Sequence, residues 1–155
     1  MSGSEFKKFS SLIAAKGVAR VQIGALCYRF IKGNPEYLLI TSRGTGRWIV
    51  PKGWPIDGKS PQDAAAEEAW EEAGVKGTVK DKCLGAFGYT KVVMDGEDFP
   101  CQVLLFPLEV KSLEQDYPES AARRRKWFRP KKAAARASDP ELAKLLRGLD
   151  PATLL

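Results

Sequence analysis

The order of hydrophobic and polar positions predicts strands on both sides of one long helix. Runs of β-branched and apolar residues, bounded by turn signals such as Asn34-Pro35, predict strands over residues 18–31, 37–41, 48–50 and 101–110. Residues 75–94 suggest a hairpin or two short strands, and residues 130–137 and 140–148 read as helices. This order predicts a single α+β domain over residues 18–150, with a mixed sheet and helices on its faces, after a partly mobile segment of residues 1–17.

The long helix has clear signals at both ends. Ser60 is a good N-cap, Pro61 suits the first helical position, and Asp63 can reach back to the cap. Gly74 can take the left-handed conformation that closes a helix. The helix is therefore predicted to cover residues 61–73.

At 100° per residue, this helix carries an apolar face and an acidic face. The apolar face consists of Ala66, Ala69, Trp70 and Ala73. We expect this face to pack on the sheet, with Trp70 as its anchor. Three carboxylates lie within about 100° of arc on the opposite side: Glu68, Glu71 and Glu72.

Two explanations of the acidic face stay open from the helix alone. A solvated face is tolerable, because like charges three or four residues apart cost only roughly 0.2–0.5 kcal/mol per pair. However, these carboxylates lie in the last turns, where the helix dipole disfavours negative charge, and no lysine or arginine is interleaved among them. A divalent cation would relieve all three at once, so metal binding is the other explanation.

Composition narrows the classes of partner. The chain has 155 residues and a formal net charge of +6, with 44% hydrophobic and 28% charged residues. A basic balance favours anionic partners such as nucleic acid, nucleotides, inositol phosphates or an acidic membrane. No stretch approaches the roughly 18 apolar residues of a membrane span, so we expect no membrane partner.

Histidine and cysteine usage limits the chemistry. The chain has no histidine, which excludes Ser-His-Asp and Cys-His sites and the common zinc sites. A general base must then be a carboxylate, a lysine, a tyrosine or water activated by a metal ion. The three cysteines are an odd number without metal-ligand spacing, and we interpret them as reduced residues of a cytoplasmic protein.

The loop before the helix, WIVPKGWPIDGKSP over residues 48–61, has the residues of a phosphate site. Gly53 allows close backbone approach, and its carbonyl oxygen is a suitable ligand for a hard cation. Lys52 offers a point charge for a phosphate. A basic, glycine-bearing loop that leads into an acidic helix suits a phosphate bridged by Mg²⁺.

The span from Gly53 to Val75 resembles the Nudix box. That motif is a Gly, five residues, Glu, seven residues, Arg-Glu, a bulky aliphatic residue, any residue, Glu-Glu, any residue, Gly and a bulky aliphatic residue. Six positions match in register: Gly53, Glu68, Glu71, Glu72, Gly74 and Val75. Ala69 replaces the first aliphatic residue, Lys59 stands at the first Glu and Glu67 at the Arg. We predict that Lys59 and Glu67 form the loop–helix ion pair of the family with the signs exchanged.

Other segments are similar to the diphosphoinositol polyphosphate phosphohydrolase branch of Nudix enzymes. They are ALCYRF, TSRGTGRWIVPKG, EEAGVKGT and RRRKWF. The resemblance implies the Nudix fold, a mixed sheet sandwiched between helices. It also implies hydrolysis of a phosphoanhydride, in a nucleoside diphosphate linked to another moiety. A dinucleoside polyphosphate or a diphosphoinositol polyphosphate is the first expectation.

The resemblance also implies roles for individual residues. Mg²⁺ or Mn²⁺ would be held by Glu68 and Glu72 with the Gly53 carbonyl, while Glu71, also a candidate ligand, would orient or deprotonate the attacking water. The catalytic roles of Glu68 and Glu71 can be exchanged. Five residues would bind the phosphates: Arg20, Ser42, Arg43, Arg47 and Lys52. Glu97 is either a further carboxylate of the site or an exposed turn residue.

A basic run supports a second class of function. Residues 123–132, RRRKWFRPKK, hold seven basic residues in ten, and we expect Trp127 and Phe128 to pack under the last helices. Such a cluster suits the rim of a polyphosphate site, and it equally suits RNA. The alternatives are an RNA 5′-end pyrophosphohydrolase and a non-catalytic Nudix domain that binds phosphate or RNA. The oligomeric state stays open.

Overall fold

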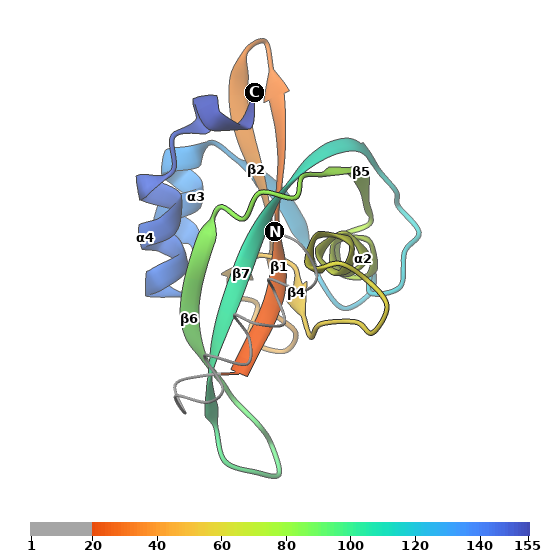
Figure 1. Ribbon diagram of the computed structural model, residues 1–155, viewed down its shortest axis with the longest axis vertical. Helices are drawn as coiled ribbons and strands as arrows, with labels where there is room; N and C mark the ends of the chain where they lie inside the picture. Colours follow the sequence, from red (N-terminus) through yellow and green to blue (C-terminus); the bar gives the residue numbers. More distant parts are fainter. Residues whose placement is uncertain (1–19) are drawn as a thin grey trace.

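The computed structural model describes residues 20–155 (Figure 1), so the N-terminal segment of residues 1–17 that was predicted to be mobile lies outside the described residues. The strands are β1 (Arg20–Ile31), β2 (Asn34–Thr41), β3 (Trp48–Ile49), β4 (Lys52–Gly53), β5 (Val75–Val79), β6 (Gly85–Lys91), β7 (Phe99–Leu113) and β8 (Arg125–Phe128). The helices are α2 (Pro61–Ala73), α3 (Pro130–Arg136) and α4 (Pro140–Gly148), followed by the 3₁₀ helix η1 (Pro151–Leu154).

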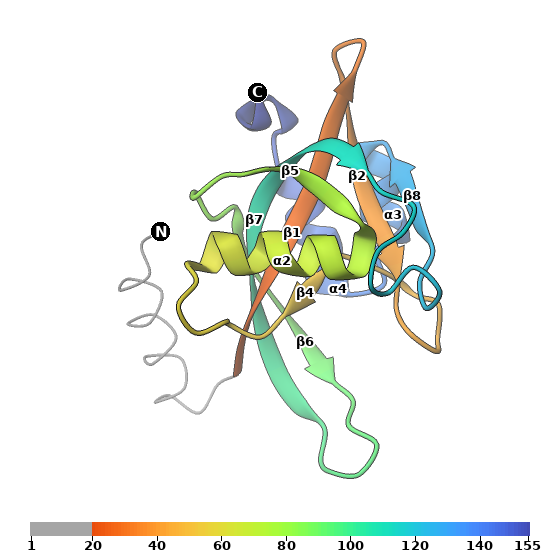
Figure 2. The ribbon, with the colours of Figure 1, turned by 90° about the vertical axis from the view of Figure 1, so that its right-hand side faces the viewer.

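Two long strands, β1 and β7, form the centre of the sheet. They pair in parallel, from Arg20 beside Cys101 to Tyr28 beside Glu109. The other strand pairs are antiparallel: β2 and β4 pair with β1, β5 and β6 with β7, and β3 and β8 with β2. The predicted mixed sheet is therefore confirmed, and the short strand β4 lies on it beside α2 (Figure 2).

Helices cover both faces of this sheet. In Figure 1, α2 lies on one side of the strands and α3 and α4 lie on the other. A buried apolar cluster occupies each face: one includes Ala65 and Phe106 on the side of α2, and the other includes Phe87 and Leu142 on the side of α3 and α4. The expected arrangement of a sheet between helices is confirmed.

The local predictions for α2 hold at both ends. Ser60 adopts an extended backbone and its Oγ accepts a hydrogen bond from the Asp63 N–H at 3.2 Å, while Gly74 closes the helix with φ of 67°. Residues 75–94 form two strands, but each pairs with β7 and not with the other. Strand β8 was not expected, because a run of basic residues does not show the apolar alternation of a strand.

The predicted packing of α2 was wrong for Trp70 and for Glu72, which was expected on the side opposite the packed face. Trp70 is only half-buried, with Lys76 Nζ 5.2 Å from its ring centroid, and it does not anchor the helix to the sheet. The buried face consists of Pro61, Ala64, Ala65, Ala69, Glu72 and Ala73. The alanines bring the helix close to the sheet, and a glutamate lies in the middle of this face.

Two further expectations have clear outcomes. Phe128 packs in the cluster under α3 and α4 as expected, but Trp127 packs against the cluster on the α2 side, because successive residues of a strand point to opposite faces. None of the helices within residues 20–155 has the length and apolar character needed to cross a membrane.

Candidate active site

The first feature of the site is a close contact between the loop backbone and α2. Strand β4 pairs with β1 through Gly53 and Ile23, which fixes the loop against the sheet. A Cβ atom on residue 53 would lie 2.3 Å from both Cδ and Oε1 of Glu68. Glycine is therefore required here, because only the absence of a side chain lets the Glu68 carboxylate lie against the loop.

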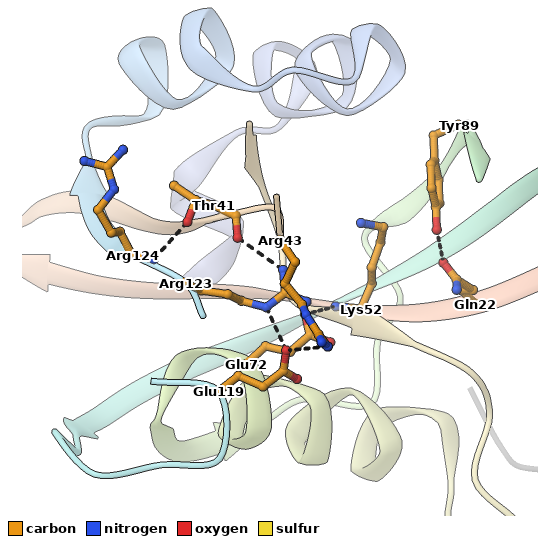
Figure 3. Close-up of polar contacts among 9 residues, drawn as sticks. All are labelled: Gln22, Thr41, Arg43, Lys52, Glu72, Tyr89, Glu119, Arg123 and Arg124. Carbon is orange, nitrogen blue, oxygen red and sulfur yellow. Dashed lines mark hydrogen bonds and ion pairs between the residues drawn. The ribbon is translucent and has the colours of Figure 1, made fainter. Parts of the chain in front are cut away.

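The Glu72 carboxylate lies between the helix and the sheet. Glu72 is 5% exposed, its Oε1 accepts a hydrogen bond from the Lys52 N–H at 3.4 Å, and Arg123 Nη2 is 3.7 Å from the same oxygen (Figure 3). Burial is the main cause that raises the pKa of Glu72 to about 8, and a hydrogen bond with the Glu68 side chain adds to it. The half-buried Glu68 carboxylate and the buried Glu72 carboxylate thus lie together, with Arg123 beside Glu72 as a counter-charge.

Glu71 and Glu67 form a second pair on the neighbouring arc of the helix. Burial raises the pKa of Glu71, and the charges of Glu68 and Glu67 and a hydrogen bond with Glu67 raise it further. Glu67 in turn contacts Lys59, with Nζ 3.2 Å from Oε2. The predicted contact between Lys59 and Glu67, with the signs of the family motif exchanged, is confirmed.

The residues around Gly53 fit a hard divalent cation. Glu68 and Glu72 supply carboxylate oxygens and Gly53 a backbone carbonyl, and Mg²⁺ is held in proteins by one or two carboxylates with water and phosphate oxygens. Within residues 20–155, no three acidic, cysteine or histidine side chains lie together so that they could hold a metal ion. The candidate donors are two carboxylates and one backbone carbonyl.

The Lys52 side chain extends from this position toward Tyr89 (Figure 3). Lys52 Nζ lies 4.7 Å from the ring centroid of Tyr89, whose hydroxyl donates a hydrogen bond to Gln22. Burial lowers the pKa of Lys52, although the charges of Asp139 and Glu72 act against this. Lys52 is the predicted phosphate ligand that the structure places nearest to Glu72.

Two residues of the site were missed in the sequence. The side chain of Arg123 is 11% exposed; its Nε donates to Glu119 Oε1 at 3.1 Å and its Nη1 to the Thr41 carbonyl at 3.1 Å. Arg43 Nη1 lies 3.5 Å from the same Glu119 oxygen (Figure 3). Arg123 was visible only as one member of the basic run, and no local pattern distinguishes Glu119.

The other predicted phosphate ligands lie in different surroundings. Ser42 Oγ is 2.7 Å from Thr45 Oγ1 and accepts from the Arg47 N–H at 2.9 Å, so Ser42 and Arg47 organise the loop between β2 and β3. Arg20 lies at the start of β1, with its Cζ 4.0 Å from the Phe99 ring centroid. Glu97 is exposed in the turn between β6 and β7, as the simpler of its two explanations expected.

A polar cavity of about 310 Å³ adjoins Arg123. Its walls are the loop after β2 and the segment before β8, and they consist of Thr41, Ser42, Gly44, Gly46 and residues 120–124. Four of these are glycine or alanine, so the space between the two segments is open to a ligand that reaches the cations.

Three successive cations of the basic run of residues 123–132 contact different neighbours. Arg125 Nη1 donates to the Ala73 carbonyl at 2.7 Å and so supplies a cation at the C-terminus of α2. Arg124 Cζ lies 5.9 Å from the Trp48 ring centroid and Lys126 Nζ 5.5 Å from that of Phe128. Because β8 alternates between the two faces, neighbouring cations of the run are separated.

Comparisons with known proteins agree with this geometry. Mouse (Mus musculus) diphosphoinositol polyphosphate phosphohydrolase 3-alpha is 35% identical over 106 residues, which are 67% of this chain and 60% of that protein. Nudix hydrolase 21, chloroplastic, of Arabidopsis thaliana is 37% identical over 117 residues, which are 70% of this chain and 54% of that protein. The chain thus matches less than two thirds of the length of these relatives.

A solved structure and a family model complete the comparison. The crystal structure of a binary complex of C. elegans Ap4A hydrolase matches with a TM-score of 0.57 and 25% identity, over 82% of this chain and 92% of that one. The model of the NUDIX domain matches residues 20–149. With the glutamates of α2 placed against Gly53, these matches show that the chain belongs to the Nudix family.

Proposed function

We propose that this protein is a metal-dependent pyrophosphohydrolase that cleaves a phosphoanhydride, either in a nucleoside diphosphate linked to another moiety or in a diphosphoinositol polyphosphate. The observation that carries the proposal is the pair of carboxylates, Glu68 and Glu72, held against Gly53 with Lys52 and Arg123 beside them. Dinucleoside polyphosphates and diphosphoinositol polyphosphates are the first candidate substrates, in line with the names of the C. elegans and mouse proteins.

Mg²⁺ or Mn²⁺ would be held by Glu68, Glu72 and the Gly53 carbonyl. When bound, the cation would neutralise charge on bridging phosphate oxygens and lower the pKa of coordinated water. Glu71 is a further candidate ligand, although its side chain is paired with Glu67.

Glu71 is the favoured acceptor for the proton of the attacking water. Its pKa is raised by burial and by the charges of Glu68 and Glu67, and a carboxylate whose pKa is closer to neutral is the better general base. Glu68 can exchange roles with Glu71, because both lie on adjacent arcs of the same helix.

Cationic side chains from three parts of the fold would bind the phosphate chain of the substrate. Lys52 comes from β4, Arg43 from the loop after β2, and Arg20 from the start of β1. Arginine is suited to bidentate phosphate contact and lysine to a point contact. The contacts among Ser42, Thr45 and Arg47 would hold this loop in place and position Arg43.

RNA is not the proposed substrate. The run of residues 123–132 favoured RNA in the sequence, but its Arg125 and Lys126 lie on opposite faces of β8. An RNA 5′ end is therefore a comparison in the assay. The cytoplasmic location expected from the cysteines stays a prediction.

The test is phosphate release by the full chain with Mg²⁺, with Mn²⁺ and with a chelator. The panel is diadenosine polyphosphates, nucleoside triphosphates, nucleotide sugars, an inositol pyrophosphate and 5′-triphosphate RNA. We expect metal-dependent turnover of one class, and a loss of about 10²–10⁴-fold in Glu71→Gln, the range of general base catalysis. Glu36→Gln, which alters a carboxylate paired with Arg29 outside the site, is the matched control and should keep full activity.

Two outcomes would contradict the proposal. One is the absence of phosphate release from every substrate of the panel with either metal, for a chain that remains folded. The other is turnover that persists in the chelator. Activity of Glu71→Gln equal to that of Glu36→Gln would remove Glu71 from the mechanism and move the role of base to Glu68.

A further inference from the structure

An aromatic pair, of which Trp54 is exposed and Phe99 half-buried, lies next to the candidate active site. The Trp54 ring stacks on Phe99, with centroids 6.2 Å apart and planes 26° from parallel. Arg20 Cζ lies 4.0 Å from the centroid of the same Phe99 ring. Trp54 is 42% exposed, so part of the indole is available to a ligand.

This pair does not belong to the hydrophobic core. The two clusters on the faces of the sheet include Trp48 and Trp127 as partly buried members, but neither Trp54 nor Phe99. All four tryptophans lie within the described residues, and Trp54 alone is exposed while the other three are half-buried. The packing of the fold therefore does not account for an indole at this position.

The position of the indole relative to the phosphate site is set by the backbone. Trp54 directly follows Gly53, so the two Cα atoms are about 3.8 Å apart across a trans peptide bond. The Gly53 backbone contacts the Glu68 carboxylate on one side. A ligand whose phosphates lie against Gly53 would thus have Trp54 within reach of the group that it carries next to those phosphates.

The aromatic pair lies beside Arg20 at the start of β1. Figure 3 shows Arg43 and Arg123 on one side of Lys52, and Gln22 with Tyr89 on the other. Arg20 lies two residues before Gln22 on β1, on the same face of the strand. Phosphates that extend from Arg43 past Lys52 would therefore reach Arg20 and the aromatic pair.

The chemistry of an exposed indole selects a flat aromatic group. A nucleobase presents a π face that stacks on tryptophan whatever the base, whereas a phosphorylated inositol ring is saturated and has no such face. The guanidinium of Arg20, already over Phe99, adds a cation at the edge of the platform.

We propose that Trp54, supported by Phe99 and Arg20, is the stacking platform for the base of a nucleoside polyphosphate. This inference rests on the proposed function, since it assumes that the phosphates lie against Gly53. It narrows the substrate class from phosphoanhydrides in general to those that carry a nucleoside. Inositol pyrophosphates would gain nothing from this platform.

The test compares two ligands that differ in the presence of a base. Calorimetric titration of the full chain with ADP and with inorganic tripolyphosphate, at one salt concentration, gives both affinities. We expect Trp54→Ala to weaken ADP binding about tenfold, the usual loss for one stacked base, and to change tripolyphosphate binding less than twofold. Trp54→Phe should retain most of the affinity for ADP, because a phenyl ring preserves the stack.

Trp70→Phe is the matched control for the loss of an indole. Trp70 lies on α2 beneath Lys76 and should leave both affinities unchanged. Quenching of tryptophan fluorescence by ADP should persist in Trp70→Phe and fall in Trp54→Phe. Thermal melts of each variant establish that the chains compared are folded.

Several results would overturn the inference. Equal weakening of ADP and tripolyphosphate in Trp54→Ala would mean that the substitution disturbs the phosphate site alone. Unchanged ADP affinity, together with a shift from dimer to monomer in Trp54→Ala, would make the aromatic pair an interface between two copies of the chain. Turnover of inositol pyrophosphate by the wild type, with equal ADP affinity in wild type and Trp54→Ala, would preserve the proposed function and refute the platform. ADP binding that is lost in Trp54→Ala, without turnover of any substrate by the wild type, would support the platform and refute the proposed function.

Discussion

The two glutamate pairs of α2 have the same spacing and different surroundings. Glu68 and Glu72 are four residues apart and lie toward the sheet, where Glu72 is 5% exposed. Glu67 and Glu71 are also four residues apart, but Glu67 is more than a third exposed and contacts Lys59 at the surface. One helix thus carries an inner pair, Glu68 and the buried Glu72, and an outer pair, Glu67 and Glu71, one residue out of phase.

The difference indicates that the loop and the alanines of α2 decide which carboxylates lie against Gly53. Ala65, Ala69 and Ala73 are fully buried and allow α2 to approach the sheet closely. Gly53 then leaves space for the carboxylate of Glu68, which a Cβ would fill. On the other arc of the helix, Glu67 instead forms a surface ion pair with Lys59.

The largest effect on activity is expected when the space at Gly53, beside the Glu68 carboxylate, is filled by a side chain. Gly53→Ala places a Cβ 2.3 Å from Cδ of Glu68, so the carboxylate or the loop must move. A displacement of about 1 Å in a catalytic group costs on the order of 10²-fold in rate. We expect metal-dependent phosphate release by Gly53→Ala to fall by about that factor, as measured by kcat/KM.

Gly148→Ala is the control for this substitution. It makes the same change at the end of α4, where a Cβ would have no heavy atom within 4 Å. It should keep full activity and stability. Full activity in Gly53→Ala would mean that Glu68 is not held at the loop for catalysis, and the contrast between the two pairs would fail.

A second prediction concerns the stability of the metal-free protein as a function of pH. Burial raises the pKa of Glu72 from 4.5 to about 8 in the folded state, so between these values the folded chain binds more protons than the unfolded chain. The free energy of unfolding must then decrease as pH rises through this window, and the stabilisation is fully present only below pH 4.5. We expect a loss on the order of 1–2 kcal/mol between pH 5 and 8, since water penetration reduces the burial penalty.

Urea unfolding in the presence of a chelator measures this loss. The difference between wild type and Glu72→Gln isolates the contribution of Glu72, because the other ionisable groups are common to both chains. Mg²⁺ should flatten the wild-type curve, since a bound cation stabilises the ionised carboxylates. Parallel curves for wild type and Glu72→Gln would show that Glu72 is not protonated in the folded protein.

Much of the fold was predictable because local signals agreed with the final structure. Ser60, Pro61 and Gly74 defined both ends of α2, and the apolar runs of β1 and β7 gave strong strand patterns. Strand β8 was missed because its pairing with β2 depends on a long-range contact, Tyr37 beside Phe128, and its sequence RKWF lacks a clean alternation. Trp70 was misplaced because hydrophobicity alone assigns an indole to the interior.

The site was predictable where residues lie in one contiguous motif and not where they meet through folding. Gly53, Glu68 and Glu72 were assigned from the resemblance to the Nudix box, and the structure brings them together. Arg123 and Glu119 reach the same place from the segment between β7 and β8, and no spacing rule connects them to α2. Local contacts in the loop organise Ser42 and Arg47 in a way that composition does not indicate.

The smallest effect is expected at the surface ion pair that supports the second glutamate pair. Lys59 and Glu67 are in contact at 3.2 Å with side chains 42% and 37% exposed, and exposed pairs are typically worth roughly 0.2–1 kcal/mol. Lys59→Glu alone and Glu67→Arg alone should each destabilise the protein by a few tenths of a kcal/mol, because each sets like charges together. The double variant, which exchanges the signs, should recover most of the loss.

A coupling energy of zero in this cycle, from urea unfolding at low salt, would make Lys59 and Glu67 independent surface charges. A coupling that also appears in kcat/KM would instead show that the ion pair positions Glu71, and the two pairs of α2 would then be linked in function.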